Sequence, residues 1–142
     1  MSLGIYLFFE GNCREAFEFY RSVLGGEYVV LQTFGDGPPD MNVSEEEKDR
    51  VMHVSLAFGS AVLMGSDSAS AFGPPPVQGT NFALSIEGES REHCDEVLAK
   101  LSDGGTVTMP MQETFWGAYF GSWTDRFGVS WMINYELPQK QE

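Results

Sequence analysis

Two stretches of the chain, IYLFFEGNCREAFEFYRSVLGG at 5–26 and NFALSIEGESREHCDEVLAKLSDGG at 81–105, follow one pattern that decides the fold. Each begins with a short apolar run typical of a strand, and continues with apolar residues at helical spacing that end at a pair of glycines. Asn12 and Ser90 stand where a helix N-cap is expected. Each stretch therefore predicts a strand followed by a helix.

The similarity between the two halves continues after the predicted helices. Each helix is followed by a run with the composition of a strand, at 27–34 and at 106–115. Each half then has a Phe-Gly pair that leads into a further strand, FGSAVLM at 58–64 and FGVSWMI at 127–133. The predicted class is α+β, with two tandem βαβββ modules. Because neither module can bury its sheet alone, we expect them to form one curved, cup-like and mostly antiparallel sheet.

The 142 residues are predicted to form one domain that spans 1–142. The first module is expected to cover 1–67 and the second 81–138. The segment 68–80 is rich in Ser, Gly and Pro, and is predicted to be the linker between them.

Charge and composition limit the classes of partner. The chain has 21 acidic residues against 8 Lys and Arg, a formal net charge of −13 at pH 7, and no basic run that could neutralise phosphates. No stretch approaches the roughly 20 apolar residues of a membrane span, and the N-terminus lacks the pattern of a signal peptide. We expect a cytoplasmic protein without nucleic-acid or membrane partners. Cys13 and Cys94 have no CxxC spacing and are expected to be free thiols.

Alternation along the strands separates a core face from a second face. In HVSLAF at 53–58, Val54 and Leu56 are expected beneath a helix, whereas His53 and Ser55 lie on the other face. The aromatic residues between 112 and 134 are too many to leave in solvent. The second face is therefore expected to line a cavity or a subunit contact.

The residues expected to bind a ligand on that face share small, polar, soft or aromatic side chains. They are Phe115, Trp116, Trp123, Asn81, Ser55, Met132 and Asn134.

Two residues are candidates for acid–base chemistry. His53 is of the side-chain type that titrates near neutrality, and Glu113 lies beside aromatic residues, where desolvation would make it a stronger base. A hydrogen-bonded structural role for His53 and a solvent-facing strand end for Glu113 are the alternatives. Asp67 and Asp125 are expected to hold turns through their own backbone neighbours.

Three stretches resemble a known superfamily in their order and content: YLFFEGNCREAFEFY, VMHVSLAFGSAVLMGSD and QETFWGAYFGSWTDRFGVSWMIN. They are similar to the vicinal oxygen chelate proteins, which include glyoxalase I, bleomycin-resistance proteins and extradiol dioxygenases. More closely, they resemble PhnB-type proteins, sometimes labelled 3-demethylubiquinone methyltransferase-like. The resemblance covers nearly the whole chain, and it implies a homodimer with a cup for a small molecule and, in many members, a divalent metal.

The resemblance also indicates where a glyoxalase-type metal would find its ligands. The matching positions are Ile5, Leu63 or Met64, Asn81 and Met132. Apolar side chains supply no oxygen or nitrogen donors, so no such metal is expected, and the cofactor, if any, is left unknown. No strand, glycine-rich loop and acidic residue are arranged as a nucleotide-like cofactor requires, so methyltransferase activity is not expected either.

Whether the protein is an enzyme is left open by the sequence. The favoured hypothesis is a metal-free binding protein whose aromatic-lined cup holds a small molecule. The alternative is an enzyme with a rearranged site, in which Glu113 or His53 acts as a base or aids a displaced divalent ion. A third hypothesis makes the aromatic face a subunit interface without a pocket.

Overall fold

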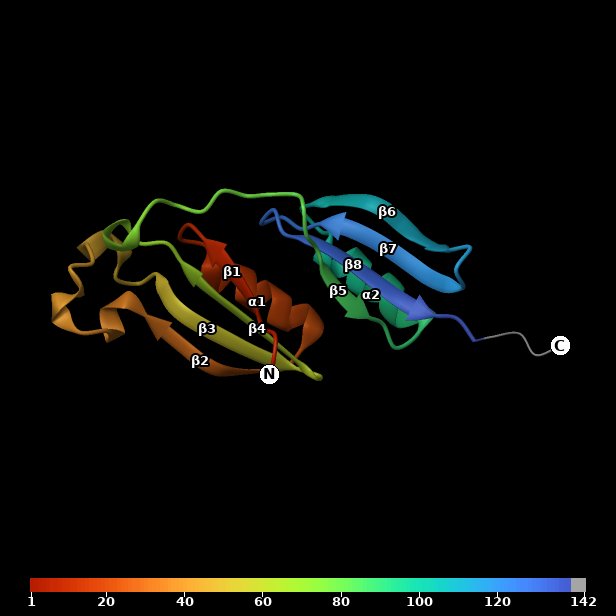
Figure 1. Cartoon of the computed structure of the whole chain (residues 1–142), viewed down its shortest axis with the longest axis horizontal. Helices are drawn as coiled ribbons and strands as arrows, with labels where there is room; N and C mark the ends of the chain where they lie inside the picture. The colour runs from red at the N-terminus through yellow and green to blue at the C-terminus, as the bar shows by residue number, and fades with distance from the viewer. Residues whose placement is uncertain (139–142) are drawn as a thin grey trace. The chain divides into compact units, whose positions relative to one another are not determined.

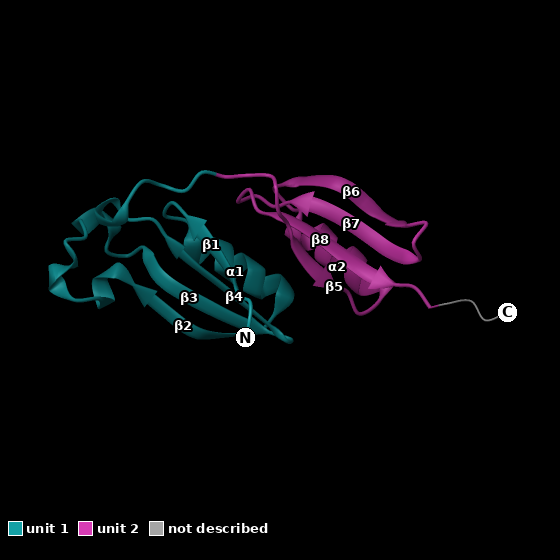
Figure 2. Ribbon diagram, in the orientation of Figure 1, with its two compact units in different colours: residues 1–77 teal, residues 78–142 magenta. Residues whose placement is uncertain are grey.

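The computed structural model describes residues 1–138 and divides the chain into two compact units, Met1–Val77 and Gln78–Glu142 (Figures 1 and 2). Each unit holds one βαβββ module, with its helix on one face of its sheet. The predicted domain range also takes in residues 139–142, which lie outside the described residues. The packing of both modules as one domain stays a prediction.

The first unit is a four-stranded sheet with one α-helix. Its elements are β1 (Ile5–Phe9), α1 (Cys13–Leu24), β2 (Glu27–Thr33), β3 (Val51–Phe58) and β4 (Ala61–Asp67). The strand order is β1-β4-β3-β2, in which β1 runs parallel to β4 and the other neighbours are antiparallel. The connections also contain four 3-10 turns, η1 (Phe34–Asp36), η2 (Pro39–Met41), η3 (Glu45–Glu47) and, after β4, η4 (Ser70–Phe72).

The second unit repeats this topology. Its elements are β5 (Leu84–Glu87), α2 (Arg91–Leu101), β6 (Thr106–Glu113), β7 (Ala118–Thr124) and β8 (Ser130–Glu136). The order β5-β8-β7-β6, with β5 parallel to β8, matches that of the first sheet strand for strand. The predicted class, α+β with two mostly antiparallel βαβββ modules, is confirmed. The common cup of the two sheets stays a prediction.

The helix of the first unit packs closely on its sheet because β4 has a glycine at the contact. A Cβ on Gly65 would lie 2.7 Å from Cε2 of Phe17 in α1, so a larger residue would push the helix away. Val54, Leu56 and Leu63 are buried on the same side. In each unit we call this side of the sheet the helix face and the opposite side the distal face.

The helix face of the second unit is built around two tryptophans. Trp123 of β7 and Trp131 of β8 are register partners, and their rings stack with centroids 6.2 Å apart at an interplanar angle of 3°. Cys94 and Val97 of α2 are buried with them. Cys13 and Cys94 are both free and buried, as expected, and desolvation raises the pKa of each thiol.

One predicted strand is shorter than expected. The stretch 81–105 was predicted to begin with a strand, but β5 begins only at Leu84, where parallel pairing with Trp131 starts. Phe82 is exposed in the segment before the strand. Among residues 1–138, no helix is long and apolar enough to cross a membrane.

The N-termini of the two helices are held in different ways. Ser90 caps α2 as expected, because its Oγ accepts a hydrogen bond of 3.0 Å from the backbone N–H of His93. Asn12 makes no such bond to α1, so the predicted cap at this position is wrong. The backbone conformation of Asn12 is not the extended one typical of a capping residue.

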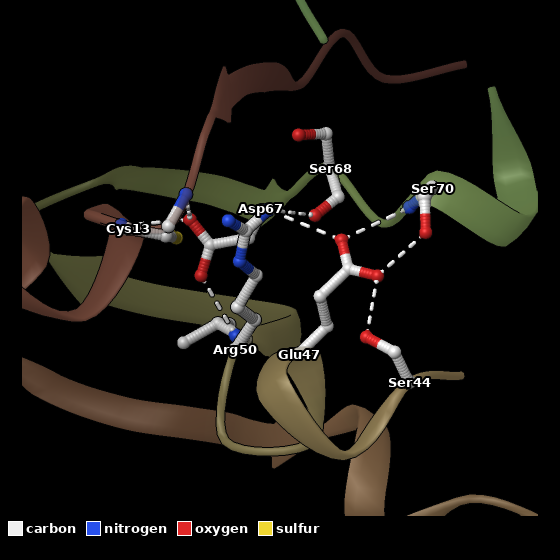
Figure 3. A network of polar contacts seen from close by, with 9 residues as sticks. Cys13, Ser44, Glu47, Arg50, Asp67, Ser68 and Ser70 are labelled. Atoms are coloured by element: carbon white, nitrogen blue, oxygen red, sulfur yellow. Dashed lines mark hydrogen bonds and ion pairs between the residues drawn. The ribbon is translucent and has the colours of Figure 1, made fainter. Parts of the chain in front are cut away.

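Asp67, at the end of β4, accepts the backbone hydrogen bonds at the start of α1 in place of Asn12 (Figure 3). Its Oδ1 accepts from the N–H groups of Gly11 and Cys13 at 2.8 and 2.9 Å, and its Oδ2 accepts from that of Val51 at 2.8 Å. The expectation that Asp67 serves its own turn is therefore wrong, since its partners come from the β1–α1 junction and from β3. A buried carboxylate needs such partners, because an unpaired charge is costly to desolvate.

We expect Asp67→Asn to lower the free energy of unfolding by about 2 kcal/mol. The two carboxylate oxygens of Asp67 accept from three backbone N–H groups, whereas asparagine has one uncharged acceptor oxygen. Urea denaturation followed by circular dichroism measures the change. Asp40→Asn in η2, where the side chain is exposed, is the matched control and should stay within about 0.5 kcal/mol of wild type. Equal stability of the two variants would contradict this role of Asp67.

Candidate functional site

A pocket of about 550 Å³ lies in the first unit, against the ends of β1 and β4. Its lining is mostly aromatic, thioether and proline side chains, with two serines. The residues that the following paragraphs use are Phe8, Phe34, Met41, Met52, Ser66 and Phe72. None of the residues that the sequence singled out for ligand binding or catalysis lines this pocket.

The floor of the pocket is the distal face of the sheet. Phe8 of β1 and Ser66 of β4 are register partners, and they alternate with residues buried beneath α1. Met52 joins them because β3 has a bulge. His53 pairs with Gln32 and Val51 pairs with the adjacent Thr33, so Met52 is an extra residue and the alternation shifts there.

Two loops form the walls. Phe34 of η1 and Met41 of η2 come from the connection between β2 and β3, and Phe72 of η4 comes from the segment after β4. The rings of Phe34 and Phe72 stack with centroids 5.9 Å apart at 19°, which joins one wall to the other. Phe72 is 61% exposed, whereas Phe34 is buried. Phe72 therefore stands at the mouth of the pocket.

A polar network ties the same two loops together (Figure 3). Oε1 of Glu47 accepts from the hydroxyls of Ser44 and Ser70 at 2.9 and 2.7 Å, and its Oε2 accepts from the N–H of Ser70 at 3.0 Å. Arg50 donates to the carbonyl oxygen of Ser68 at 2.9 Å and lies 3.4 Å from Glu47. The pKa of Glu47 is lowered by the hydrogen bonds from Ser70, of which the bond from the hydroxyl has the largest effect and the bond from the backbone N–H the next largest. We call these five residues the Glu47 network.

A polar pair lies on the distal face beside the pocket. The hydroxyl of Tyr6 and Nδ1 of His53 are 3.0 Å apart, and the two rings stack at 5.6 Å and 21°. The ring of Tyr6 also contacts that of Phe8, with centroids 5.1 Å apart. Because Phe8 is part of the pocket floor, the pair continues that floor along the distal face. His53 thus lies on the face to which alternation assigned it, and its catalytic role stays a prediction.

Glu113 lies at the end of β6, in the solvent-facing setting that was one of the two alternatives left open by the sequence. It is the register partner of Tyr119 on the helix face of the second unit, and it forms an ion pair with Arg91 at the start of α2. Its side chain is 61% exposed, so Glu113 is not in the desolvated surroundings that a role as general base would need. His53 belongs to the first unit and Glu113 to the second, and a site that combines them stays a prediction.

Most of the other candidates lie on distal faces or in turns. Met132 and Asn134 of β8 are half-buried on the distal face of the second unit, opposite Ser122 and Phe120. Trp116 contacts the ring of Phe120 with centroids 5.9 Å apart. Their binding role stays a prediction.

Three further candidates are placed individually by the structure. Ser55 is buried in the first unit on the distal face of β3, whereas Phe115 is 98% exposed in the turn between β6 and β7. Asn81 is exposed in the segment before β5. The binding role of each stays a prediction.

Trp123 is the candidate whose position argues against a binding role. It is 1% exposed and stacked on Trp131 beneath α2, because the alternation of β7 turns it towards the helix together with Tyr119 and Gly121. Its indole N–H is buried without a hydrogen-bond partner among the described residues. The count of aromatic residues suggested a cavity wall here, whereas the strand register makes Trp123 part of the core.

The metal-ligand positions of the first module need one correction. Ile5 and Leu63 are register partners, and Leu63 alternates with Gly65 on the helix face, where no ligand could reach. Of the two expected alternatives, Met64 is the one on the distal face, and its register partner there is Tyr6. Tyr6 therefore takes the place of Ile5 in the expected donor set, beside Met64.

In the second module, the corresponding positions on the distal face are Ser85 of β5 and its register partner Met132 of β8. Hydroxyl and thioether groups do not make up the carboxylate and imidazole set that divalent ions require. Within residues 1–138, no three His, Cys, Asp or Glu side chains form a group that could hold a metal ion. The residues present do not fit a glyoxalase-type centre, and the lack of such a metal in the protein stays a prediction.

A family model described as 3-demethylubiquinone-9 3-methyltransferase matches residues 2–134. The chain belongs to this PhnB-type family. It is 33% identical to protein YjdN of Escherichia coli (strain K12) over 139 residues, which cover 94% of this chain and 95% of YjdN. The resemblance found in the sequence is thereby confirmed.

Three solved structures are similar to the fold of this chain. Protein PA1353 from Pseudomonas aeruginosa is 42% identical, with a TM-score of 0.84 over 96% of this chain and all of that one. A putative 3-demethylubiquinone-9 3-methyltransferase, PhnB protein, from Bacillus cereus is 25% identical, with a TM-score of 0.77 over 95% and 99%. A glyoxalase/bleomycin resistance protein/dioxygenase family enzyme from Burkholderia phytofirmans, 16% identical over 94% and 96%, shares the fold alone, with a TM-score of 0.63.

We expect Glu47→Gln to loosen the loops around the pocket, because an amide cannot accept from all three donors of Ser44 and Ser70. The Ser70 amide should exchange with deuterium about fivefold faster in the variant. Glu45→Gln is the control: Glu45 lies in the same 3-10 turn and forms an ion pair with Lys48 at the surface, so the Ser70 amide of this variant should exchange as in wild type.

The same carboxylate makes the network sensitive to pH. Folding lowers the pKa of Glu47. The stability that its charged carboxylate contributes to the network is therefore fully present above the ordinary pKa of 4.5, and it is lost as the pH falls through the lowered pKa of the folded state. The difference in exchange between wild type and Glu47→Gln should therefore shrink in that acidic range. A difference that is constant with pH would contradict a role for the charged form.

Metal content tests the donor set directly. Protein purified without chelator or affinity tag should contain about 0.1 divalent ion per chain or less by elemental analysis, because the distal-face positions lack suitable donors. A His53→Ala, Glu113→Ala double variant serves as the control. Near-stoichiometric metal in wild type that disappears in the double variant would establish a displaced metal site.

Proposed function

We propose that the protein binds a small, apolar or aromatic molecule in the pocket of the first unit, without a glyoxalase-type metal. The observation that supports this proposal is the lining, in which three phenylalanines and two methionines surround about 550 Å³. This volume lies in the range of small-molecule sites, which are lined mainly by apolar and aromatic side chains with a few polar groups.

The side chains of the pocket suit a planar ligand. Phe8 and Phe72 are both largely exposed, and covering their rings would remove apolar surface from water. Met41 and Met52 are unbranched and flexible, so they adapt to ligands of differing outline. The polar groups that accompany them, Ser66 and Ser68, are too few to bind a strongly polar molecule on their own.

Two further properties belong to this proposal. A homodimer is supported by the apolar surface of the edge strand β6 and its turn, where Val107, Met109, Phe115 and Trp116 are exposed. A cytoplasmic location is supported by the two buried free thiols, Cys13 and Cys94.

An enzyme that uses His53 and Glu113 is the alternative. The place of His53 beside the pocket favours it, whereas the ion pair of Glu113 with Arg91 on the helix face does not. We therefore give the binding function precedence and assign Glu113 no part in it.

Phe72→Ala should weaken the binding of a neutral fluorescent probe, N-phenyl-1-naphthylamine, about fivefold, because one aromatic wall of the pocket is removed. Fluorescence titration gives the dissociation constant. Phe82→Ala, which removes an exposed phenylalanine of the second unit, is the matched control and should bind as wild type does. If wild type fails to bind, or if both variants lose affinity equally, the pocket is not the binding site.

A further inference from the structure

The pocket and the Tyr6–His53 pair form one continuous surface. Tyr6 extends from β1 across β4 to reach His53 on β3, since the strand order is β1-β4-β3. Its ring lies within contact distance of Phe8 on one side and of His53 on the other, at 5.1 and 5.6 Å. A ligand that covers the ring of Phe8 would therefore lie next to the ring of Tyr6, close to the Tyr6 hydroxyl and the His53 imidazole.

The hydrogen bond within the pair leaves polar groups available to a ligand. If the Tyr6 hydroxyl donates to Nδ1, the proton of a neutral His53 is on Nε2, which then donates outwards, and the phenol oxygen can still accept. If Nδ1–H donates to the phenol oxygen, the Tyr6 hydroxyl donates outwards and Nε2 accepts. In either tautomer the pair offers one free donor and one free acceptor.

The charges around the pocket favour an uncharged head group. Asp67 is the charged residue of the lining, and backbone N–H groups occupy both of its carboxylate oxygens. Arg50 is committed to Glu47 and to the carbonyl oxygen of Ser68. With a net charge of −13 and no Lys or Arg among the described residues that line the pocket, a carboxylate or phosphate would enter without a counter-charge.

We infer that the Tyr6–His53 pair is the polar subsite of the pocket, and that it binds the hydroxyl or carbonyl oxygen of an uncharged aromatic molecule. This inference rests on the proposed function and adds the class of ligand to it. Phe8, Met52 and Phe72 contact the ring system, and the pair orients it through one oxygen.

Three probes with one ring system separate the subsite from the pocket: 2-naphthol, 2-methylnaphthalene and 2-naphthoate. Wild type should bind 2-naphthol about fivefold more tightly than the isosteric 2-methylnaphthalene, which corresponds to one net hydrogen bond. The anionic 2-naphthoate should bind most weakly. Equilibrium dialysis measures all three dissociation constants.

Two variants remove the polar groups and keep the rings. Tyr6→Phe and His53→Phe should each abolish the preference for 2-naphthol and leave the affinity for 2-methylnaphthalene within about twofold of wild type. Tyr28→Phe is the matched control, because it removes a tyrosine hydroxyl that bonds to Glu18 away from the pocket. It should retain the full preference.

The two proposals fail in different ways. Suppose that 2-methylnaphthalene binds and that Phe72→Ala weakens this binding, so that the pocket is the binding site. The subsite is then overturned if wild type shows no preference for 2-naphthol, or if Tyr6→Phe retains that preference. It is also overturned if 2-naphthoate binds most tightly. The pocket itself is overturned if Phe72→Ala changes the affinity for none of the probes.

Discussion

The carboxylate of Asp67 is the interaction on which the first unit depends. It ends β4, accepts from the backbone at the start of α1, and accepts from the first residue of β3. Three segments that are distant in sequence are thus fixed to one buried side chain. The pocket begins at the same place, because β4 leads directly from Ser66 and Asp67 into the wall at Ser68 and Ala69. The junction that supports the helix therefore also sets the position of the pocket.

The second unit uses a buried aspartate for a more local purpose. Asp125 accepts from the N–H groups of Phe127 and Val129 and from the indole N–H of Trp131. The first two partners confirm the turn role predicted from its sequence neighbours. The third fixes the orientation of one ring of the tryptophan pair. Both aspartates satisfy backbone donors, but they do so at different points of the same topology.

The sequence predicted the repeated elements well because each is encoded locally. Helical spacing and strand alternation predicted α1, α2 and the succession of helix and strands along the chain, and they placed His53 on the correct face. The pocket was missed for physical reasons. Its walls come from loops without periodicity, and Met52 reaches its floor only through a bulge that alternation does not reveal. Trp123 was misjudged because its surroundings depend on cross-strand register. The setting of Glu113 was left open because its ion-pair partner, Arg91, is distant in the sequence.

The two modules share a topology but differ in the loops that they carry. The connection between β2 and β3 spans residues 34–50, whereas the corresponding connection between β6 and β7 spans only residues 114–117. The stacked rings of Phe34 and Phe72 lie in this longer loop and in the segment that joins the modules. Substitutions in these unrepeated segments would therefore reshape the pocket of the first unit and leave the sheet and helix that the two units share as they are.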